Sequence, residues 1–357
     1  MNRRVKLLST TWLLLPIVLV AGCPTTTDKP IDTSNNSSID TAVALDLSDG
    51  TATLTSSRLT SADVDFFELG ALSAGDRVIV DVQTASGNLD PVAAIFDADL
   101  NIFTLNDDRT PDSNFNPLID AVIREAGTYY VAVSAFAGTA TSGTYKLTVT
   151  LQLNSGVVEP EGQVVFFDWA GGSGITIPNV GTFDLPRFDA AQVGLASSQT
   201  AALKTLVEAI VINSYAGYDI TFRSSDRDAR PGAPHTTIYF GSFNRQAFAI
   251  SEQVDMLNAD PADDAIIFTE SFNGAFSTAP SLDQMALAMG NTTAHEIGHL
   301  LGLVHTAQAS DLMDTTGGNN SILVPQKFET APIDDSVFPT GFQDSVQLLG
   351  WILGLAL

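Results

Sequence analysis

Three of the four histidines in this chain of 357 residues stand close together, with a glutamate and a glycine between them. The segment reads His295-Glu-Ile-Gly-His-Leu-Leu-Gly-Leu-Val-His305. Histidines four positions apart lie one turn above each other on one face of a helix, so the imidazoles of His295 and His299 can converge on a metal ion. Gly302 can take a positive φ and end the helix, which lets the chain turn back and bring His305 to the same ion.

This set of residues predicts a catalytic rather than a structural zinc site. Three neutral imidazoles at about 2.0 to 2.1 Å leave the fourth position of a zinc ion open, as in catalytic sites. Glu296 directly follows the first ligand and is placed to take a proton from water as the general base. A structural site would need a fourth protein ligand, and only His235 and Cys23 remain among the histidines and cysteines. We therefore expect one Zn²⁺ on the three clustered histidines.

The pattern resembles the signature of the metzincin zinc proteases. Asp311-Leu-Met-Asp314 resembles the Met-turn of that family, with Met313 eight residues after the third histidine, a spacing similar to that of the matrixin branch. The resemblance covers about residues 163–357. It implies a metalloendopeptidase whose five-stranded twisted sheet lies over two helices, with a cleft floored by the zinc-binding helix and a C-terminal helix near 343–353. It also implies that Met313 forms a hydrophobic floor under the ion and is not a ligand.

A second cluster of possible metal ligands precedes the expected zinc-binding helix, in the acidic segment 252–264. Related enzymes often have calcium-binding loops at this place, and oxygen ligands of this kind suit Ca²⁺. An ordinary acidic loop explains the composition equally well. The candidate calcium ligands are Asp255, Asn258, Asp260, Asp263 and Asp264. His235 has two readings as well, an auxiliary electrophile in the cleft or an ordinary residue at the end of a strand.

The elements that must position the site are helices and strands in alternation. Apolar residues recur on one stripe over 198–214, which predicts a helix. Ser281 with Gln284 could form a capping box that starts the zinc-binding helix, although Gly290 and Asn291 leave a later start open. Strands are expected at 164–168, 219–222, 236–240 and 265–269. This order predicts an α/β (α+β) domain over 163–357.

Residues 41–153 have a different pattern, typical of an all-β antiparallel sandwich. Apolar residues alternate with polar ones in Tyr145-Lys-Leu-Thr-Val-Thr-Leu-Gln152 and around Val78, Val80 and Val82, with polar turns between the runs. Asp63-Val-Asp-Phe-Phe-Glu68 and Ala126-Gly-Thr-Tyr-Tyr130 look like motifs of the bacterial pre-peptidase C-terminal domain, which implies an accessory module. A Gly- and Pro-containing linker, 154–162, separates the two domains, so the protein is expected to be multidomain.

Five acidic residues of the sandwich could also hold calcium, or they are solvated turn residues. These residues are Asp63, Asp65, Asp90, Asp107 and Asp108.

The N-terminus predicts export. Three basic residues and a short apolar run before Cys23 are typical of a signal peptide over 1–22, too short to span a membrane. Val20-Ala-Gly-Cys23 resembles the lipobox of bacterial lipoproteins, which implies that Cys23 becomes the acylated N-terminus. Residues 23–40 have almost nothing to bury and predict a flexible tether. We expect a protein held by this lipid at the cell envelope, at the outer membrane or cell surface.

The net negative charge of the chain excludes some classes of binding partner. Loss of the signal peptide removes three of the 16 basic residues and none of the 41 acidic ones, so the formal charge changes from −25 to −28. Such a field repels nucleic acid and anionic lipid headgroups, which leaves the lipid as the membrane contact. We expect a monomeric zinc metalloendopeptidase that cleaves extracellular or periplasmic proteins or peptides. The alternative is a surface-binding lipoprotein whose protease fold is inactive.

Overall fold

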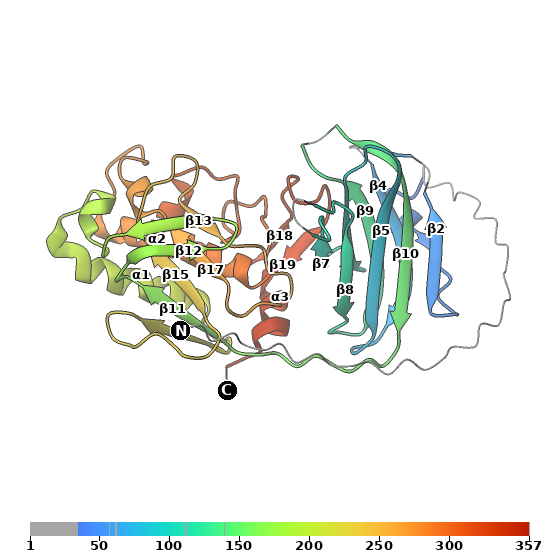
Figure 1. The fold of residues 1–357 in the computed structure, drawn as a ribbon, viewed down its shortest axis with the longest axis horizontal. Helices are drawn as coiled ribbons and strands as arrows, with labels where there is room; N and C mark the ends of the chain where they lie inside the picture. Colours follow the sequence, from blue (N-terminus) through green and yellow to red (C-terminus); the bar gives the residue numbers. More distant parts are fainter. Residues whose placement is uncertain (1–34, 57, 61–62, 111–112, 139, 357) are drawn as a thin grey trace, which may run out of the picture.

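The computed structural model describes residues 35–356, except 57, 61–62, 111–112 and 139. The predicted signal peptide, Cys23 and most of the predicted tether lie outside the described residues. The described part is rich in β-strands, which form several separate sheets, and it has three α-helices. Two parts of the chain stand side by side, residues up to about 153 and residues from about 163 onward (Figure 1). None of the described helices is long and apolar enough to cross a membrane.

The first part is a pair of sheets packed face to face. One sheet has the order β1 (Val43–Ala44), β4 (Val64–Leu72), β9 (Gly127–Ala135), β6 (Pro91–Asp97) and β7 (Ile102–Asn106). The other has the order β2 (Thr51–Thr55), β10 (Ser142–Gln152), β5 (Arg77–Gly87) and β8 (Leu118–Val122), with β3 (Leu59–Thr60) also paired to β10. All these pairs are antiparallel except β1 with β4, which is parallel. The alternating valines of β5 lie fully buried between the sheets.

The ordered structure begins earlier than the predicted tether allows. Asn36 is buried, and its side chain donates a hydrogen bond of 2.9 Å to the carbonyl of Phe66 in β4. The amide of Phe66 in turn donates to the carbonyl of Asn36 at 2.8 Å. A short 3₁₀ helix, η1 (Ile39–Thr41), follows. Residues 36–41 are therefore attached to the sandwich, because Asn36 forms two hydrogen bonds with Phe66 of β4.

The second part contains one mixed five-stranded sheet. Its order is β14 (Ile220–Ser224), β11 (Gln163–Asp168), β15 (Thr236–Phe240), β17 (Asp264–Ile267) and β16 (Ala249–Ser251). Four strands are parallel, and β16 is antiparallel to its neighbour at the edge. The four predicted strands match β11, β14, β15 and β17 within two residues at each end. The edge strand β16 was not predicted, because three half-buried residues give too short a pattern.

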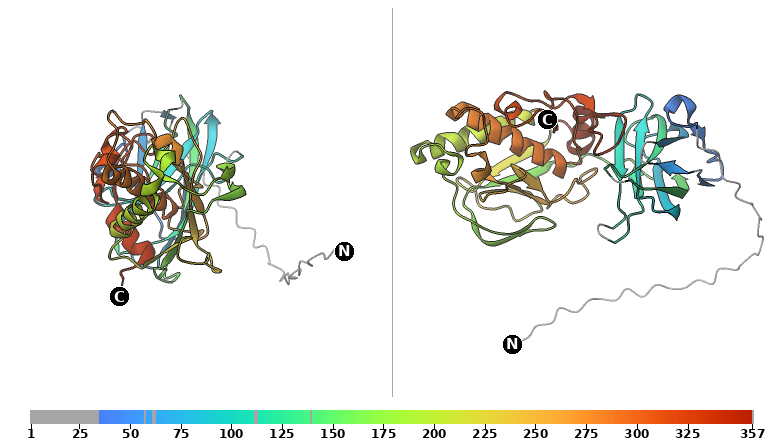
Figure 2. Two further views of the ribbon diagram at one scale, coloured as in Figure 1. Left: turned by 90° about the vertical axis from the view of Figure 1, so that its left-hand side faces the viewer. Right: turned by 90° about the horizontal axis from the view of Figure 1, so that it is seen from above.

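Each face of this sheet has its own cover. Ile238, Phe240 and Ile267 pack into one core with α1 (Thr200–Ser214) and α2 (Leu282–Leu300). Tyr239 and Ile266 face the opposite side, under a hairpin of β12 (Gly172–Ile177) and β13 (Gly181–Leu185). Figure 2 shows α1 and α2 running together along one side of the sheet. Strands buried on both faces explain why β15 is apolar or small at every position.

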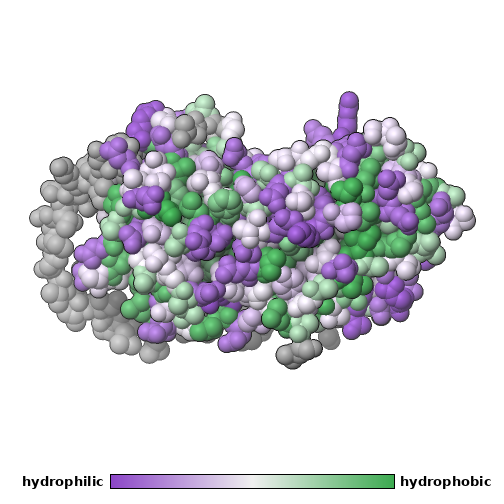
Figure 3. Space-filling model, turned by 180° about the vertical axis from the view of Figure 1, so that it is seen from behind, coloured by the Kyte–Doolittle hydropathy of each residue, from purple (hydrophilic) through white to green (hydrophobic). Residues whose placement is uncertain are grey.

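The chain ends beside the sandwich. A two-stranded ribbon of β18 (Thr330–Pro332) and β19 (Phe342–Asp344) leads into α3 (Ser345–Leu353), close to the predicted C-terminal helix. The remaining 3₁₀ turns are η2 (Ala190–Val193), η3 (Ser197–Gln199), η4 (Thr269–Phe272) and η5 (Ser321–Leu323). Hydrophilic residues are spread over both parts of the face shown in Figure 3, in keeping with the net charge of −25.

Candidate metal centre

Helix α2 carries the candidate site, and its start is fixed by a capping box. The Ser281 hydroxyl accepts a hydrogen bond from the amide of Gln284, and the Gln284 side chain accepts one from the amide of Ser281. The capping box predicted from the sequence is therefore confirmed, and the helix runs through Gly290 and Asn291 without interruption. Nearly every residue from Met285 to Leu300 is buried, so the helix passes through the core of the second part.

The end of α2 is a Schellman turn. The amide of Gly302 donates to the carbonyl of His299 at 2.9 Å, and the amide of Leu303 donates to the carbonyl of Gly298 at 2.8 Å. Gly302 has a φ of +85°, as predicted. A side chain there would also collide with the loop at 255–257, since a Cβ would lie 2.8 Å from the carbonyl oxygen of Asp255. This turn reverses the chain toward His305.

Met313 packs directly against the helix. It is fully buried, and a Cβ at Gly298 would lie 2.6 Å from its sulfur. The backbone of this turn is joined to the segment after the third histidine, because the amide of Thr306 donates to the carbonyl of Met313 at 2.9 Å. The hydroxyl of Thr306 also donates to the carboxylate of Asp311 at 2.7 Å. The residues of the predicted Met-turn therefore support the site from below.

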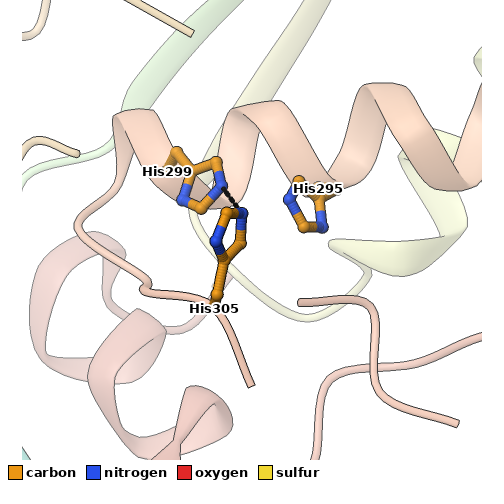
Figure 4. A group of neighbouring side chains, drawn as sticks. All are labelled: His295, His299 and His305. Atoms are coloured by element: carbon orange, nitrogen blue, oxygen red, sulfur yellow. Dashed lines mark hydrogen bonds between the residues drawn. The ribbon is translucent and has the colours of Figure 1, made fainter. Parts of the chain in front are cut away.

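The three predicted histidines meet. One ring nitrogen of each histidine lies within 4.8 Å of a ring nitrogen of each of the other two. His295 and His299 project from α2, and His305 reaches up from the returning chain (Figure 4). The Nε2 atoms of His299 and His305 are 3.0 Å apart. Among the described residues, these three histidines form a group of side chains that could hold a metal ion.

Hydrogen bonds at the far side of two rings set their tautomers. The Nδ1 of His295 is 2.7 Å from the carbonyl of Leu312, and the Nδ1 of His299 is 2.8 Å from the carbonyl of Leu303. A carbonyl can only accept, so both Nδ1 atoms carry the proton and both Nε2 atoms present a lone pair to the centre. Partners of this kind are typical of metal-binding histidines. The donor set therefore fits a metal ion that prefers imidazole, although the identity of the metal does not follow from it.

Burial keeps the rings neutral, which metal binding requires. Loss of water around His295, followed by the nearby ring of His305, lowers its pKa to about 4. Burial and then its two neighbouring rings lower the pKa of His299, and burial lowers that of His305 despite the attraction of Asp334 and Asp314. These shifts favour unprotonated imidazoles at neutral pH.

Glu296 lies beside the histidines and is itself almost completely buried. Burial raises the pKa of its carboxyl group to about 8, while hydrogen bonds from the side chain and backbone of Ser251 act in the opposite direction. Ser251 ends the edge strand β16, so the glutamate is held between the helix and that edge. This contact was not predictable from the sequence, because it depends on an edge strand that was too short to predict.

A side-chain amide fixes the backbone just before the third histidine. The Oε1 of Gln343 accepts a hydrogen bond from the amide of Val304 at 2.7 Å, and its Nε2 donates to the carbonyl of Val304 at 3.0 Å. Gln343 is fully buried in β19. The position of His305 therefore depends on a residue almost forty positions later, which no local motif could indicate.

The predicted calcium ligands are only loosely gathered. Asp255, Asp260 and Asp264 each accept hydrogen bonds from backbone amides of the loop or of β15. Asp263 is buried, and its Oδ1 accepts a hydrogen bond from Thr236 at 3.3 Å. The Oδ2 of Asp263 and the Oδ1 of Asn258 are buried and have no hydrogen-bond partner among the described residues. Burial, then the charges of Asp255 and its neighbours, raises the pKa of Asp263 to about 8.

Two other predicted features take ordinary roles. His235 lies just before β15, its Nδ1 is 2.8 Å from the carbonyl of Ala233, and its ring packs on Phe166. It is not part of the histidine group. In the sandwich, Asp63 accepts a hydrogen bond from the hydroxyl of Thr60, and Asp65 accepts one from the hydroxyl of Tyr145. The acidic residues of the sandwich form no metal-binding group in the described part of the chain.

Two cavities adjoin the histidines. One, of about 400 Å³, lies within the second part between α2, the segment before β16 and the turn at 312–315, and is lined by His295, Glu296 and His305. The other, of about 570 Å³, lies between the second part and the sandwich, and is lined by His299 and His305 on one side. Both volumes are in the range of ligand-binding sites, about 300 to 1,000 Å³.

No family model and no curated protein matches the chain. Three of the solved structures with some likeness to the chain each cover about a third of it. The g-type lysozyme inhibitor PliG of Aeromonas hydrophila has 16% identity and a TM-score of 0.26, covering 31% of this chain and 96% of that protein. The surface-associated copper-binding protein CorA of Methylomicrobium album BG8 has 13% identity and a TM-score of 0.24, with coverage of 31% and 98%.

The pre-peptidase C-terminal domain of a Bacillus anthracis collagenase is also weakly similar. It has 16% identity and a TM-score of 0.21, covering 34% of this chain and 97% of that domain. This is a weak likeness to the domain type that the sandwich resembles in sequence. With such low TM-scores, none of the three bears on what this chain does.

Proposed function

We propose that the protein is a zinc-dependent metalloendopeptidase of the metzincin type, and that its substrates are extracellular or periplasmic proteins. The observation that carries the proposal is the convergence of three imidazole nitrogens within 4.8 Å beside a buried glutamate. Three imidazoles with an adjacent carboxylate suit the hydrolysis of peptide bonds better than a purely structural site. The turn at Met313 under the helix supports assignment to the metzincins.

The residues of the site have separate roles. When bound, zinc supplies a Lewis acid that polarises the scissile carbonyl and lowers the pKa of water. In its carboxylate form, which the charge of a bound zinc ion would favour against the burial that raises its pKa, Glu296 would accept the proton of the attacking water and deliver it to the leaving amine. The carbonyls of Leu303 and Leu312 hold the rings of His299 and His295 in the required tautomer. Ser251 orients the carboxylate of Glu296 from the edge strand.

The edge strand β16 offers a place for the substrate backbone. Among the described strands, Ala249–Ser251 pair with β17 on one side only, so the other side, apart from the Ser251 backbone group that bonds to Glu296, can bind an extended peptide as a further strand. Ser251 touches Glu296, which places this edge next to the general base. A peptide aligned along β16 would therefore cross the three histidines.

The proposal is tested with residues 24–357 and an unfolded generic protein as substrate. We expect cleavage that a chelator abolishes and added zinc restores. Glu296→Gln should lower kcat/KM by roughly 10² to 10⁴-fold while one zinc ion stays bound. Glu161→Gln, at an exposed position outside the site, is the matched control and should keep full activity. Activity that survives Glu296→Gln would contradict the mechanism.

The alternative, a binding lipoprotein with an inactive protease fold, makes a different prediction. Zinc would bind with normal affinity, but no generic, periplasmic or surface protein would be cut. The three histidines and Glu296 are all present and lie together, which supports the enzyme.

We further propose that the protein is exported and anchored by a lipid on Cys23. The support is the signal-peptide pattern and the resemblance to a lipobox, both outside the described residues. A labelled fatty acid should be incorporated into the wild-type chain and not into Cys23→Ser. Labelling of both chains, or of neither, would contradict this anchor.

Calcium in the loop at 252–264 is proposed as a second ion. The support is a pair of buried oxygen atoms, on Asn258 and Asp263, that have no hydrogen-bond partner in the part of the chain that the structure describes and that lie near several carboxylates.

A further inference from the structure

The larger cavity beside the histidines has walls from both parts of the molecule. The second part contributes Val304 and His305, and the sandwich contributes Val92, Leu105, Asp107 and Phe136. His305 also lines the smaller cavity, so the two cavities meet at the proposed metal centre. A polypeptide that crosses the three histidines would enter the space next to the sandwich.

The sandwich wall is held firmly in place. The outer faces of β4, β6 and β9 are buried with the second part in one continuous hydrophobic core. The rings of Phe96 and Phe338 have centroids 5.5 Å apart, and the amide of Phe342 donates to the carbonyl of Leu100 at 2.8 Å. Figure 1 shows β18 and β19 beside β7 at this junction. Because these contacts fix the position of the sandwich beside the cavity, its side chains can contribute to substrate selection.

The lining combines apolar surface with negative charge. The apolar part comes from both sides and includes Leu105, Phe136 and Val304. Asp107 lies at the sandwich wall, and one of its carboxylate oxygens accepts a hydrogen bond from the amide of Asp108. In the described part of the chain, Asp107 forms no ion pair with a lysine or arginine, and Arg109, two positions further on, pairs with Asp81. Asp90 is close enough for the charge of Asp107 to affect its ionisation.

We propose that this cavity is a substrate subsite, in which the sandwich domain selects a lysine or arginine side chain through Asp107. The inference rests on the proposed proteolytic function and adds a specificity-determining residue to it. Lysine and arginine have long apolar stems that can lie along apolar surface while the charged end reaches a carboxylate. A chain with 41 acidic and 16 basic residues also attracts basic substrates.

The test is a cleavage-site profile with a peptide library, read by mass spectrometry on residues 24–357. We expect a basic residue to be enriched at one fixed position relative to the cut. Asp107→Asn keeps an acceptor for the Asp108 amide and should lower the ratio of kcat/KM for lysine over alanine at that position by about three- to tenfold. Asp107→Lys should reverse the preference toward glutamate.

Asp49→Asn is the matched control, because it removes the same charge from an exposed turn of the sandwich outside the cavity. It should leave the lysine preference unchanged. Thermal unfolding checks that each variant is folded. Cleavage without a basic preference, or a preference that survives both Asp107 variants, would overturn the inference while the proposed function stands. A wild-type chain that cuts no substrate contradicts the proposed function itself.

Discussion

The sequence predicted a metal site at the histidines 295–305 and left calcium open at the acidic segment 252–264, and the two segments differ in the structure. The histidines at 295–305 converge with their ring nitrogens within 4.8 Å, whereas the acidic residues at 252–264 mostly bind backbone amides of their own loop. The two segments are nonetheless in contact, since the amide of Asp255 donates to the carbonyl of His299 at 2.9 Å. Both segments therefore meet at the C-terminal end of α2.

The difference shows what local sequence can determine. Helical periodicity fixes the distance between His295 and His299, and a glycine turn fixes the return of the third ligand. No comparable rule fixes the side chains of an irregular loop, because carboxylates there can bind either a cation or a nearby amide. The zinc prediction therefore rests on geometry, and the calcium prediction rests on composition alone.

The largest expected effect comes from removing one histidine. His299→Ala should weaken zinc binding by more than about 100-fold, because the ring is one of the three proposed ligands and is buried. His235→Ala is the matched control and should bind zinc normally, since His235 is not part of the group. Zinc affinity measured with a competing chromophoric chelator separates the two. An equal loss of zinc affinity in both variants would contradict a zinc site on the three clustered histidines.

The next effect concerns the contact between the two segments at Gly302. Gly302→Ala should lower the free energy of unfolding by about 3 kcal/mol or more, because strain at φ +85° adds to collisions with Asp255 and Leu257. Gly274 also has a positive φ but open space around it, so Gly274→Ala should lower the free energy of unfolding by only about 1 to 2 kcal/mol. Denaturant unfolding measures both. Similar losses of unfolding free energy in the two variants would mean that the loop at 255–257 moves to make room for the added methyl group.

A smaller effect is expected from the buried acid of the loop. Asp263 has a folded-state pKa of about 8 against an ordinary value of 3.8, so between these values the folded chain holds a proton that the unfolded chain has lost. Stability therefore falls as the pH rises through this window, and the loss is complete above pH 8.

Asp263→Asn removes that loss. With calcium chelated, the variant should be more stable than the wild type above pH 8, on the order of 1 to 3 kcal/mol, and the gap should close toward pH 4. Unfolding curves at several pH values check this. A constant gap at all pH values would point to packing instead of charge.

The smallest effect is that of calcium itself. Millimolar calcium should raise the unfolding free energy of the wild type by about 1 kcal/mol and leave Asp263→Asn unchanged, if the loop binds the ion. Zinc must stay bound throughout, which is checked by its retention after dialysis. An unchanged wild type would make the loop an ordinary acidic one.

The sequence predicted the elements that obey local rules. The capping box at Ser281, the strands β11 and β15 and the glycine that ends α2 follow from neighbouring residues. Alternation of the valines in β5 likewise predicted the sandwich core. These features depend on periods of two or 3.6 residues and on backbone conformations that few residues can adopt.

Long-range pairings were not predictable in the same way. Gln343 holds Val304 from almost forty residues away, and Ser251 reaches Glu296 from a strand of three residues. The wall that the sandwich forms beside His305 was also missed. One signal was present, because Val92-Ala-Ala-Ile-Phe96 is apolar at every position and a strand with one solvated face would alternate.

The continuous core between the two parts has a consequence for proteolysis of the protein itself. Residues 154–162 are exposed along their whole length, so a protease could cut there. Such a cut would break the chain but leave Phe96 packed against Phe338. The nicked protein should therefore elute as one species in gel filtration, and a lipid on its N-terminal fragment would still hold the histidine centre at the cell envelope.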